Sequence, residues 1–374
     1  MQRSKLPRDK PTRHSLKTIF QFRGKPRGII PFAGANKIVF VLIFLSYFNY
    51  GQMPETRRDS DFVIAFGSCN RQDHPQPFWE EIVKNNPDLF IWGGDNIYAD
   101  TNDMSKMSQY YTLQQNNKGY EKLKNSTTVM ATWDDHDYGK NDAGEEWEMK
   151  QESQQLFLDF IGIGKSDSRR QQEGIYTSRI FEIEKGTIKV IVLDTRYFRS
   201  PLIKNEVKGR RYNHNNDPKS TVLGETQWKW LENELENNFS DFIVIVSSIQ
   251  FLSSEHGFET WGNFPHEVKR LKKLLVDKAV RNAIILSGDR HLSEFSTTKI
   301  KGLKYPLIDF TSSGLTHAYT SYNGESNKYR VGKVIAQPSF GLLKFDLDSY
   351  TVTMEMRGNN NIVLQKYSKQ YPKN

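Results

Sequence analysis

Three carboxylates and an imidazole follow one another in the segment DDHD at residues 134–137, directly after the apolar run VMATW at residues 129–133. Carboxylates held this close repel one another unless something positive lies among them. These residue types also bind metal ions and transfer protons in active sites. The segment therefore predicts a metal site.

Four other apolar runs are also followed at once by polar side chains. The groups are Cys69 and Asn70 after 62–66, Asp95, Asn96 and Tyr98 after 89–93, Gln250 after 242–248, and Asp289 and His291 after 283–288. If the runs are strands of an open α/β sheet, their carboxyl ends converge where such sheets bind ligands. These groups require cations and outnumber the ligands of one ion. We expect two or more metals, which would activate a water and hold a phosphoryl group for in-line displacement.

The position of these polar groups depends on an alternation of strands and helices. Apolar runs predict strands at residues 62–66, 89–93, 129–133, 188–194, 242–248, 283–288 and 307–311, and a hairpin of 341–347 and 351–357 around Asp348. Helical spacing predicts helices at 77–86, 224–238 and 264–280. The sequence therefore predicts the α/β class: a layered β-sheet sandwich flanked by helices, with antiparallel edges and the metal site at strand C-terminal ends.

The charge of the chain is concentrated at its N-terminus. The net charge is +8, but residues 1–37 hold ten basic residues and one acid, a net charge of +9, so residues 38–374 carry −1. A nearly neutral remainder gives no support to nucleic-acid binding, and we expect no nucleic-acid-binding module.

An uninterrupted apolar run of eleven residues, IVFVLIFLSYF at 38–48, follows this basic segment. It is shorter than the roughly 20 residues that span a bilayer, but it matches the apolar region of a secretory signal. We interpret 38–51 as a signal peptide core or a signal anchor, with membrane attachment through 38–48 as one outcome. A buried strand is the alternative. Residues 1–37 are then a basic tail or the product of a misassigned start, and the protein is expected to be exported.

Cys69 is the only cysteine of the chain, which excludes an intramolecular disulfide. A lone thiol in an oxidising compartment is a liability unless something holds it, and a metal ion would do so. The alternative is a small buried apolar side chain.

The motifs at the five strand ends, taken together, resemble a known family. They are GSCN (67–70), GGDNIYAD (93–100), WDDHDYG (133–139), SSIQ (247–250) and SGDRH (287–291). In this order they resemble the PhoD-type alkaline phosphatases, a branch of the calcineurin-like metallophosphoesterases, in a short form without the extra N-terminal β domain. The resemblance runs from about Phe62 to Met356 and implies a metallophosphoesterase-like domain at 61–356. We expect the polar tail at 357–374 to fray.

The resemblance assigns roles to matching positions. In the family the first metal, typically ferric iron, takes a thiolate and a tyrosinate, which match Cys69 and Tyr98, and a bridging carboxylate, which matches Asp95. Asp135 stands where the wider superfamily has an asparagine ligand. His136 stands at the position of the catalytic histidine.

The closing motif implies two further ligands, Asp289 and His291. Asp289 and Gln250 both stand where the superfamily usually has histidine. Exchanging nitrogen for oxygen donors favours a harder second ion, and the family implies calcium. The cofactors expected are therefore Fe(III) and Ca²⁺, with other divalent metals as alternatives.

A second set of residues is expected to bind substrate or to orient the ligands. It comprises Asn70, Asn96, Asp134, Asp137, Arg196 and His317. Asp134 and Asp137 either support His136 and its loop or are solvated. Arg196 either holds a substrate oxygen or forms a structural pair with an aspartate.

Several ligand assignments have structural alternatives. Asp95 could cap a helix, Tyr98 could be a core aromatic, Asn70 could only shape its turn, and Gln250 could only bond the backbone. Asn141 and Asp142 could add oxygen ligands or lie exposed.

The function expected from these residues is an exported, metal-dependent phosphoesterase. Its substrate would be a phosphate mono- or diester, attacked in line by a metal-bound hydroxide, with His136 stabilising or protonating the leaving oxygen. A monomer is expected. The alternatives are a phosphodiesterase or phospholipase of the same fold, and a non-catalytic calcium-binding surface module.

Overall fold

The computed structural model describes residues 60–236 and 238–373. The segments interpreted from the sequence as a basic tail and a signal, residues 1–37 and 38–51, lie outside the described residues. Within the described ranges, no helix is long and apolar enough to cross a membrane.

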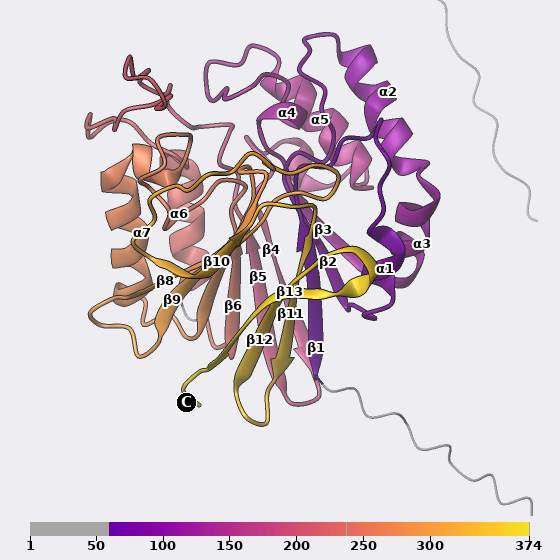
Figure 1. Ribbon diagram of the computed structural model, residues 1–374. Helices are drawn as coiled ribbons and strands as arrows, with labels where there is room; N and C mark the ends of the chain where they lie inside the picture. The colour runs from indigo at the N-terminus through magenta and orange to yellow at the C-terminus, as the bar shows by residue number, and fades with distance from the viewer. Residues whose placement is uncertain (1–59, 237, 374) are drawn as a thin grey trace, which may run out of the picture. The chain divides into compact units, whose positions relative to one another are not determined.

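Two β-sheets form the centre of the fold (Figure 1). The six-stranded sheet has the order β13-β12-β11-β1-β2-β3, and the seven-stranded sheet has the order β10-β8-β9-β7-β6-β5-β4. Strands β1, β2 and β3 run parallel to one another, as do β5, β6, β7 and β9. The remaining strands pair antiparallel, so each sheet has a parallel part and an antiparallel part.

The bounds of the elements are as follows. The strands are β1 Phe62–Gly67, β2 Leu89–Gly93, β3 Thr128–Thr132, β4 Thr177–Ile183, β5 Gly186–Val192, β6 Phe242–Val246, β7 Ala283–Ser287, β8 Ser293–Lys299, β9 Pro306–Ser312, β10 Arg330–Ile335, β11 Phe340–Asp346, β12 Thr351–Arg357 and β13 Val363–Gln370. The helices are α1 Trp79–Val83, α2 Met104–Gln115, α3 Lys118–Ser126, α4 Asp135–Tyr138, α5 Lys150–Phe160, α6 Gly224–Leu235 and α7 Pro265–Asp277.

The residues of β1 show how the layers are built. Phe62, Ile64 and Phe66 belong to a core cluster that also contains the apolar residues of the other sheet and of α6 and α7. Val63 and Ala65 belong to a second cluster, shared with α1, α2, α3 and α5. Successive side chains of a strand point to opposite faces, so one strand contributes to both clusters. The result is two sheets face to face, with helices on both outer sides (Figure 1).

The helix α7 shows why its sequence is helical. It begins with Pro265, whose fixed backbone angle suits the first turn of a helix. Leu271, Leu274 and Leu275 are buried and lie three or four residues apart, on one face. That face packs against the apolar residues of the seven-stranded sheet in the core cluster.

The α/β sandwich expected from the sequence is confirmed, and every predicted strand and helix overlaps an observed one. The hairpin around Asp348 is present as β11 and β12. The expectation that the chain frays after Arg357 is wrong, because residues 363–370 form β13, which pairs antiparallel with β12. Most side chains of β13 are exposed or half-exposed, so backbone pairing rather than an apolar pattern defines this strand.

Candidate metal centre

The two sheets bring five strand ends to one place. Ser68, just after β1, forms an isolated parallel bridge with Ser313, just after β9, which joins the end of one sheet to the end of the other. A Cβ atom on Gly288 would lie 2.8 Å from the carbonyl oxygen of Gly93, and one on Gly94 would lie 2.7 Å from Cβ of Asp134. Glycine at positions 94 and 288 therefore lets the ends of β2 and β7 and the start of α4 approach one another closely.

Four of the predicted ligands have a left-handed backbone. The φ angles are +58° at Cys69, +52° at Asp95, +69° at Asp289 and +53° at His291. Non-glycine residues rarely adopt this conformation, which costs roughly 1–3 kcal/mol each and occurs mainly at functional sites. The chain turns sharply just after each strand, and these side chains gather in the space between the sheets' ends.

The first group of donors brings His291 together with Cys69, Asp95 and Tyr98, the three residues expected to hold iron. Ligand atoms of Cys69, Asp95 and His291 all lie within 4.8 Å of one another. The Tyr98 hydroxyl lies 3.3 Å from Asp95 Oδ2 and 2.9 Å from His291 Nε2, and Cys69 Sγ lies 3.3 Å from Asp95 Oδ2. Sulfur, imidazole, phenol and carboxylate donors in one cluster suit a transition metal.

A second group of donors consists of oxygen atoms. Asp134, Asp135 and Asp289 offer ligand atoms within 4.8 Å of one another, and Asp95, Asp135 and His136 form an adjoining group. Asp95 belongs to the adjoining group with Asp135 and His136 and also to the group with Cys69 and His291. Membership of both groups suits a carboxylate that bridges two metals. Asp134 Oδ2 is buried and has no hydrogen-bond partner among the described residues. An all-carboxylate group with a free buried oxygen suits a hard cation such as calcium.

In the protein alone, burial disfavours the charged forms of these donor groups. Burial raises the pKa of the Cys69 thiol to about 11 and raises the pKa of the Asp95 and Asp289 carboxyls well above the usual range. Burial also raises the pKa of the Tyr98 phenol, and the Asp95 charge adds to the effect. A bound cation removes this penalty by favouring the ionised forms. The donor set therefore fits metal ions.

His291 is already in the form that binds a metal. Burial, together with the neighbouring His317, lowers its pKa to about 3. The imidazole is therefore neutral near pH 7, as a ligand must be. The ring of His317 lies 4.4 Å from that of His291 and 5.1 Å from that of Tyr98, so the structure brings this predicted residue into the centre.

His136 has a fixed orientation at the edge of the centre. Its Nδ1 lies 2.7 Å from Asp100 Oδ2, and its ring stacks on that of Tyr98 at 4.1 Å. Burial disfavours its charge, but the carboxylates of Asp135, Asp95 and Asp100 together raise the pKa of His136 to about 11. The imidazolium can therefore donate a proton from Nε2, the ring nitrogen that Asp100 does not occupy.

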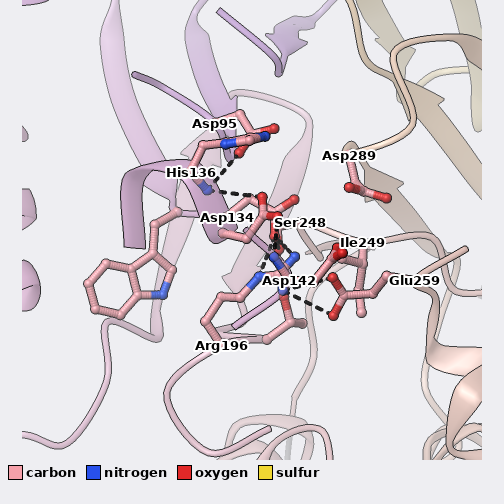
Figure 2. A network of polar contacts seen from close by, with 12 residues as sticks. Asp95, Asp134, His136, Asp142, Arg196, Ser248, Ile249, Glu259 and Asp289 are labelled. Atoms are coloured by element: carbon pink, nitrogen blue, oxygen red, sulfur yellow. Dashed lines mark hydrogen bonds and ion pairs between the residues drawn. The ribbon is translucent and has the colours of Figure 1, made fainter. Parts of the chain in front are cut away.

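Arg196 lies behind the centre in a buried ionic network (Figure 2). Its Nε donates to Asp134 Oδ1 at 2.6 Å, and its Nη1 donates to both oxygens of Glu259 at 3.0 and 2.8 Å. Ser248 Oγ donates to Asp134 Oδ1 at 2.7 Å. Arg196 is 0% exposed. The structure shows Arg196 in an ion pair with an aspartate, Asp134, and the network fixes the carboxylate of that residue.

Asp137 and Asn96 form a second buried support. Asp137 Oδ1 accepts from the backbone N–H of Asp134 at 2.6 Å, and its Oδ2 accepts from Asn96 Nδ2 at 2.5 Å. Burial raises the pKa of Asp137 to about 8. Asp134 and Asp137 are both 0% exposed, so the solvated alternative is wrong for both.

Asn70 is anchored beside the same residues. Its Nδ2 donates to Gln114 Oε1 at 2.8 Å and to the backbone oxygen of Asn96 at 3.2 Å. The side-chain carbonyl oxygens of Asn70 and Asn96 are buried and have no partner within the described part of the chain. Both could accept from a water or a substrate group.

Gln250 is fixed through side chains rather than through the backbone. Its amide nitrogen donates to Glu294 Oε1 at 2.8 Å and to Thr311 Oγ1 at 2.9 Å. These bonds leave only its carbonyl oxygen for a metal, and its role as a ligand stays a prediction. Asp142 is engaged by Tyr212 and Arg211, whose donors lie 2.5 and 2.8 Å from its Oδ2.

A cavity of about 480 Å³ opens onto the centre. Four of its lining residues are Asp135, His136, Asp289 and His291. The predicted catalytic imidazole and three predicted ligands can therefore be reached from solvent by a small molecule.

Asp100, Glu259, Ser248 and Ser313 also belong to the centre, although they were not among the predicted site residues. Asp100 and Ser248 carried a signal, because they lie in the motifs GGDNIYAD and SSIQ. Ser313 Oγ lies 3.0 Å from Cys69 Sγ although it is 244 residues away in the chain, and its one signal is that it lies four residues before His317. The partners of Asp134 and Arg196 are likewise distant in sequence.

The family model described as PhoD-like phosphatase matches residues 64–359, which is most of the chain. The chain belongs to the PhoD-like phosphatase family. This PhoD-like chain is 23% identical over 302 residues to alkaline phosphatase D of Bacillus subtilis (strain 168), in a match that covers 67% of the chain and 51% of the relative. The chain therefore spans about half the length of that relative.

Two solved structures resemble the chain. A structure of PhoD matches the PhoD-like chain with a TM-score of 0.67 at 17% identity, over 83% of this chain and 70% of that one. A dimetal phosphatase from Danio rerio gives a TM-score of 0.49 at 12% identity, over 84% of this chain and 100% of that one. The first likeness shows that the chain shares the fold of that PhoD structure, in agreement with the expected layered sandwich of two sheets.

Proposed function

We propose that this protein is a metal-dependent phosphoesterase. The observation that carries the proposal is the adjoining pair of donor groups, one containing Cys69, Asp95 and His291 and the other Asp134, Asp135 and Asp289, which gather at strand ends beside an open cavity. Family membership and the name of the relative, alkaline phosphatase D, support a phosphate ester as the substrate. Both monoesters and diesters fit this chemistry.

The donor sets favour different ions. Cys69, Tyr98, Asp95 and His291 would hold ferric iron, and the carboxylates of Asp134, Asp135 and Asp289, with Gln250 as a further candidate, would hold calcium. When bound, such ions supply Lewis acidity toward the phosphoryl oxygens and toward the attacking water.

The side chains of the protein would donate the proton and orient the donor groups. His136 lines the cavity, and Asp100 holds its Nδ1, so Nε2 is the atom that would protonate the leaving oxygen. Arg196 keeps the Asp134 carboxylate in place. Asn70 and Asn96, which are buried beside Asp137 and Gln114, support the loops that carry the donors.

The proposal includes export. A basic segment at 1–37 followed by the apolar run at 38–48 is typical of a secretory signal or a short anchor. We also propose that the protein acts as a monomer.

The test uses the full chain and an isosteric variant. Asp95→Asn removes the bridging charge but keeps the shape, and asparagine tolerates the left-handed backbone at this position. Asp277→Asn, an exposed aspartate on α7, is the matched control. Hydrolysis of 4-nitrophenyl phosphate and bis(4-nitrophenyl) phosphate is measured with metals and after chelation, together with metal content.

We expect the wild-type protein and Asp277→Asn to hydrolyse at least one ester, chelation to stop turnover, and Asp95→Asn to lose both metal and at least about 100-fold in rate. Retained turnover in folded Asp95→Asn would falsify the assignment. Stoichiometric calcium without turnover of either ester would favour a non-catalytic binding module instead.

A further inference from the structure

The cavity at the metal centre extends past the residues that could hold metals or reach the phosphoryl group. Its volume of about 480 Å³ falls in the range, roughly 300–1,000 Å³, of sites that enclose a whole small-molecule ligand. The rest of its lining includes two guanidinium groups and two aromatic rings, from Arg211, Phe258, Arg290 and Tyr319. This part of the lining, which we call the distal wall, is chemically unlike the metal centre.

Arg290 is a fixed part of the distal wall. Its guanidinium carbon lies 4.2 Å from the ring centroid of Phe258, and its Nη2 donates to both oxygens of Glu325 at 2.9 and 3.0 Å. The residue is 8% exposed, and its Nε is buried without a partner in the described ranges. Glu325 compensates its charge, so Arg290 mainly holds the aromatic ring in place.

Arg211 differs from Arg290 because it is open to solvent. Its side chain is 52% exposed, and its Nη2 lies 2.8 Å from Asp142 Oδ2. The same oxygen accepts from the Tyr212 hydroxyl at 2.5 Å, so Asp142 keeps a donor if Arg211 turns away. The Asp142 side chain is 11% exposed and the Arg211 guanidinium carbon lies 5.7 Å from the ring centroid of Tyr212, so these contacts hold the guanidinium at the cavity while the exposed part of the side chain stays open to an anion.

The backbone around Arg211 is nevertheless held at the cavity. The Arg211 N–H donates to the carbonyl oxygen of Gly257 at 2.7 Å, directly before Phe258 in the chain. On the other side, the Tyr319 N–H donates to the carbonyl oxygen of His291 at 2.7 Å. The distal wall therefore combines anchored aromatic surface with one guanidinium group that is open to solvent.

We propose that the distal wall binds the alcohol part of the ester, and that Arg211 recognises a second anionic group carried by that alcohol. Aromatic rings provide apolar contact area, and guanidinium groups pair in bidentate fashion with carboxylates and phosphates. This inference rests on the proposed phosphoesterase function and names the substrate class: esters whose alcohol bears a carboxylate or a further phosphate.

The test compares matched substrates. Phenyl phosphate, 3-carboxyphenyl phosphate, 3-phosphonophenyl phosphate and 3-(aminomethyl)phenyl phosphate, each as monoester and as methyl diester, are assayed with the metal-loaded full chain. The protein is the wild type, Arg211→Gln, Arg211→Lys or Arg210→Gln. Arg210 is the exposed neighbouring arginine outside the cavity lining, so its variant controls for the lost charge.

For the wild type and Arg210→Gln, we expect the KM of at least one anionic substrate to lie about tenfold or more below that of phenyl phosphate, the effect of one charged hydrogen bond. In Arg211→Gln this ratio should fall to about one, and Arg211→Lys should keep part of it. The carboxylate and phosphonate arms tell the two anions apart.

Two results distinguish a failure of this inference from a failure of the proposed phosphoesterase function. If phenyl phosphate is hydrolysed but the anionic substrates gain nothing, or if Arg211→Gln keeps their advantage, the inference is overturned and the phosphoesterase proposal stands. If no ester in either series is hydrolysed, both are overturned.

Discussion

Replacing Arg196 by methionine tests the buried network behind the metal centre. The change removes the partner of two carboxylates, Asp134 and Glu259, whose side chains are 0% and 1% exposed. Glu259 keeps Arg199, whose Nε lies 3.1 Å from its Oε1, but Asp134 loses its charged partner and keeps neutral donors such as the Ser248 hydroxyl. Removing one partner of a buried ion pair costs about 3–5 kcal/mol, because the other charge stays buried. We expect a loss in this range at pH 8 in chelator, mainly from Asp134.

The loss should depend on pH with a definite sign. In the folded protein burial raises the pKa of Asp134 to about 6 and that of Glu259 to about 7, above unfolded values of roughly 3.9 and 4.3. Stability from a raised pKa is fully present below the unfolded value and is lost as pH rises through the folded value. Without Arg196 the folded-state pKa values of both carboxyls rise further. The difference in the free energy of unfolding between variant and wild type should therefore be small near pH 5.5 and large at pH 8.

The assay is urea unfolding followed by circular dichroism, with Arg169→Met as the control. Arg169 pairs with Asp167 near the surface, with side chains 25% and 31% exposed, and its loss should cost about 1 kcal/mol or less. Adding Asp134→Asn to Arg196→Met should restore at least about 2 kcal/mol, because the unpaired charge is gone. Equal losses in the Arg196 and Arg169 variants, or a loss independent of pH, would refute this reasoning.

Two further predictions concern the catalytic imidazole and the iron site. Asp100→Asn should leave metal content unchanged but lower kcat, by no more than the roughly 10²–10⁴-fold that a positioned acid contributes, because His136 loses the partner of its Nδ1; an unchanged kcat in steady-state assays would show that Asp100 is dispensable. Tyr98→Phe should shift and weaken the visible absorption of the iron-loaded protein, since the phenolate is an expected source of charge transfer beside the Cys69 thiolate. Tyr120→Phe, at a buried tyrosine bonded to Trp92, should leave the spectrum unchanged, and an unchanged spectrum in Tyr98→Phe would exclude a tyrosinate ligand.

The strand ends could be found from the sequence because each has two signals at once. A buried strand leaves an apolar run, and a functional residue after it interrupts that run with a polar side chain. Cys69, Asp95, Asp135 and Asp289 all follow such runs by one to three residues. The parallel order of the strands then places them at one edge, which the structure shows.

The supports of the centre could not be found in this way. Arg196 and Asp134 are 62 residues apart, and Arg196 and Glu259 are 63 residues apart, so only the tertiary fold brings them together. The strands β4, β8, β10 and β13 were missed for a related reason, β8 because its sequence, SEFSTTK, is largely polar. Many side chains of the other three are exposed or half-exposed, so they lack the continuous apolar run of a central strand, and pairing with a neighbour defines them.

The position of Cys69 has a consequence for how the chain is held together. Its sulfur lies within 3.7 Å of the backbone oxygen of Asp289, which is 220 residues further along the chain. With one cysteine, the protein cannot close this loop by a disulfide. A cation shared by Cys69, Asp95 and His291 would close it instead, and would tie the six-stranded sheet to the seven-stranded one as a removable cross-link. The supply of metal during maturation would then decide whether the folded chain resists proteolysis, before any substrate is bound.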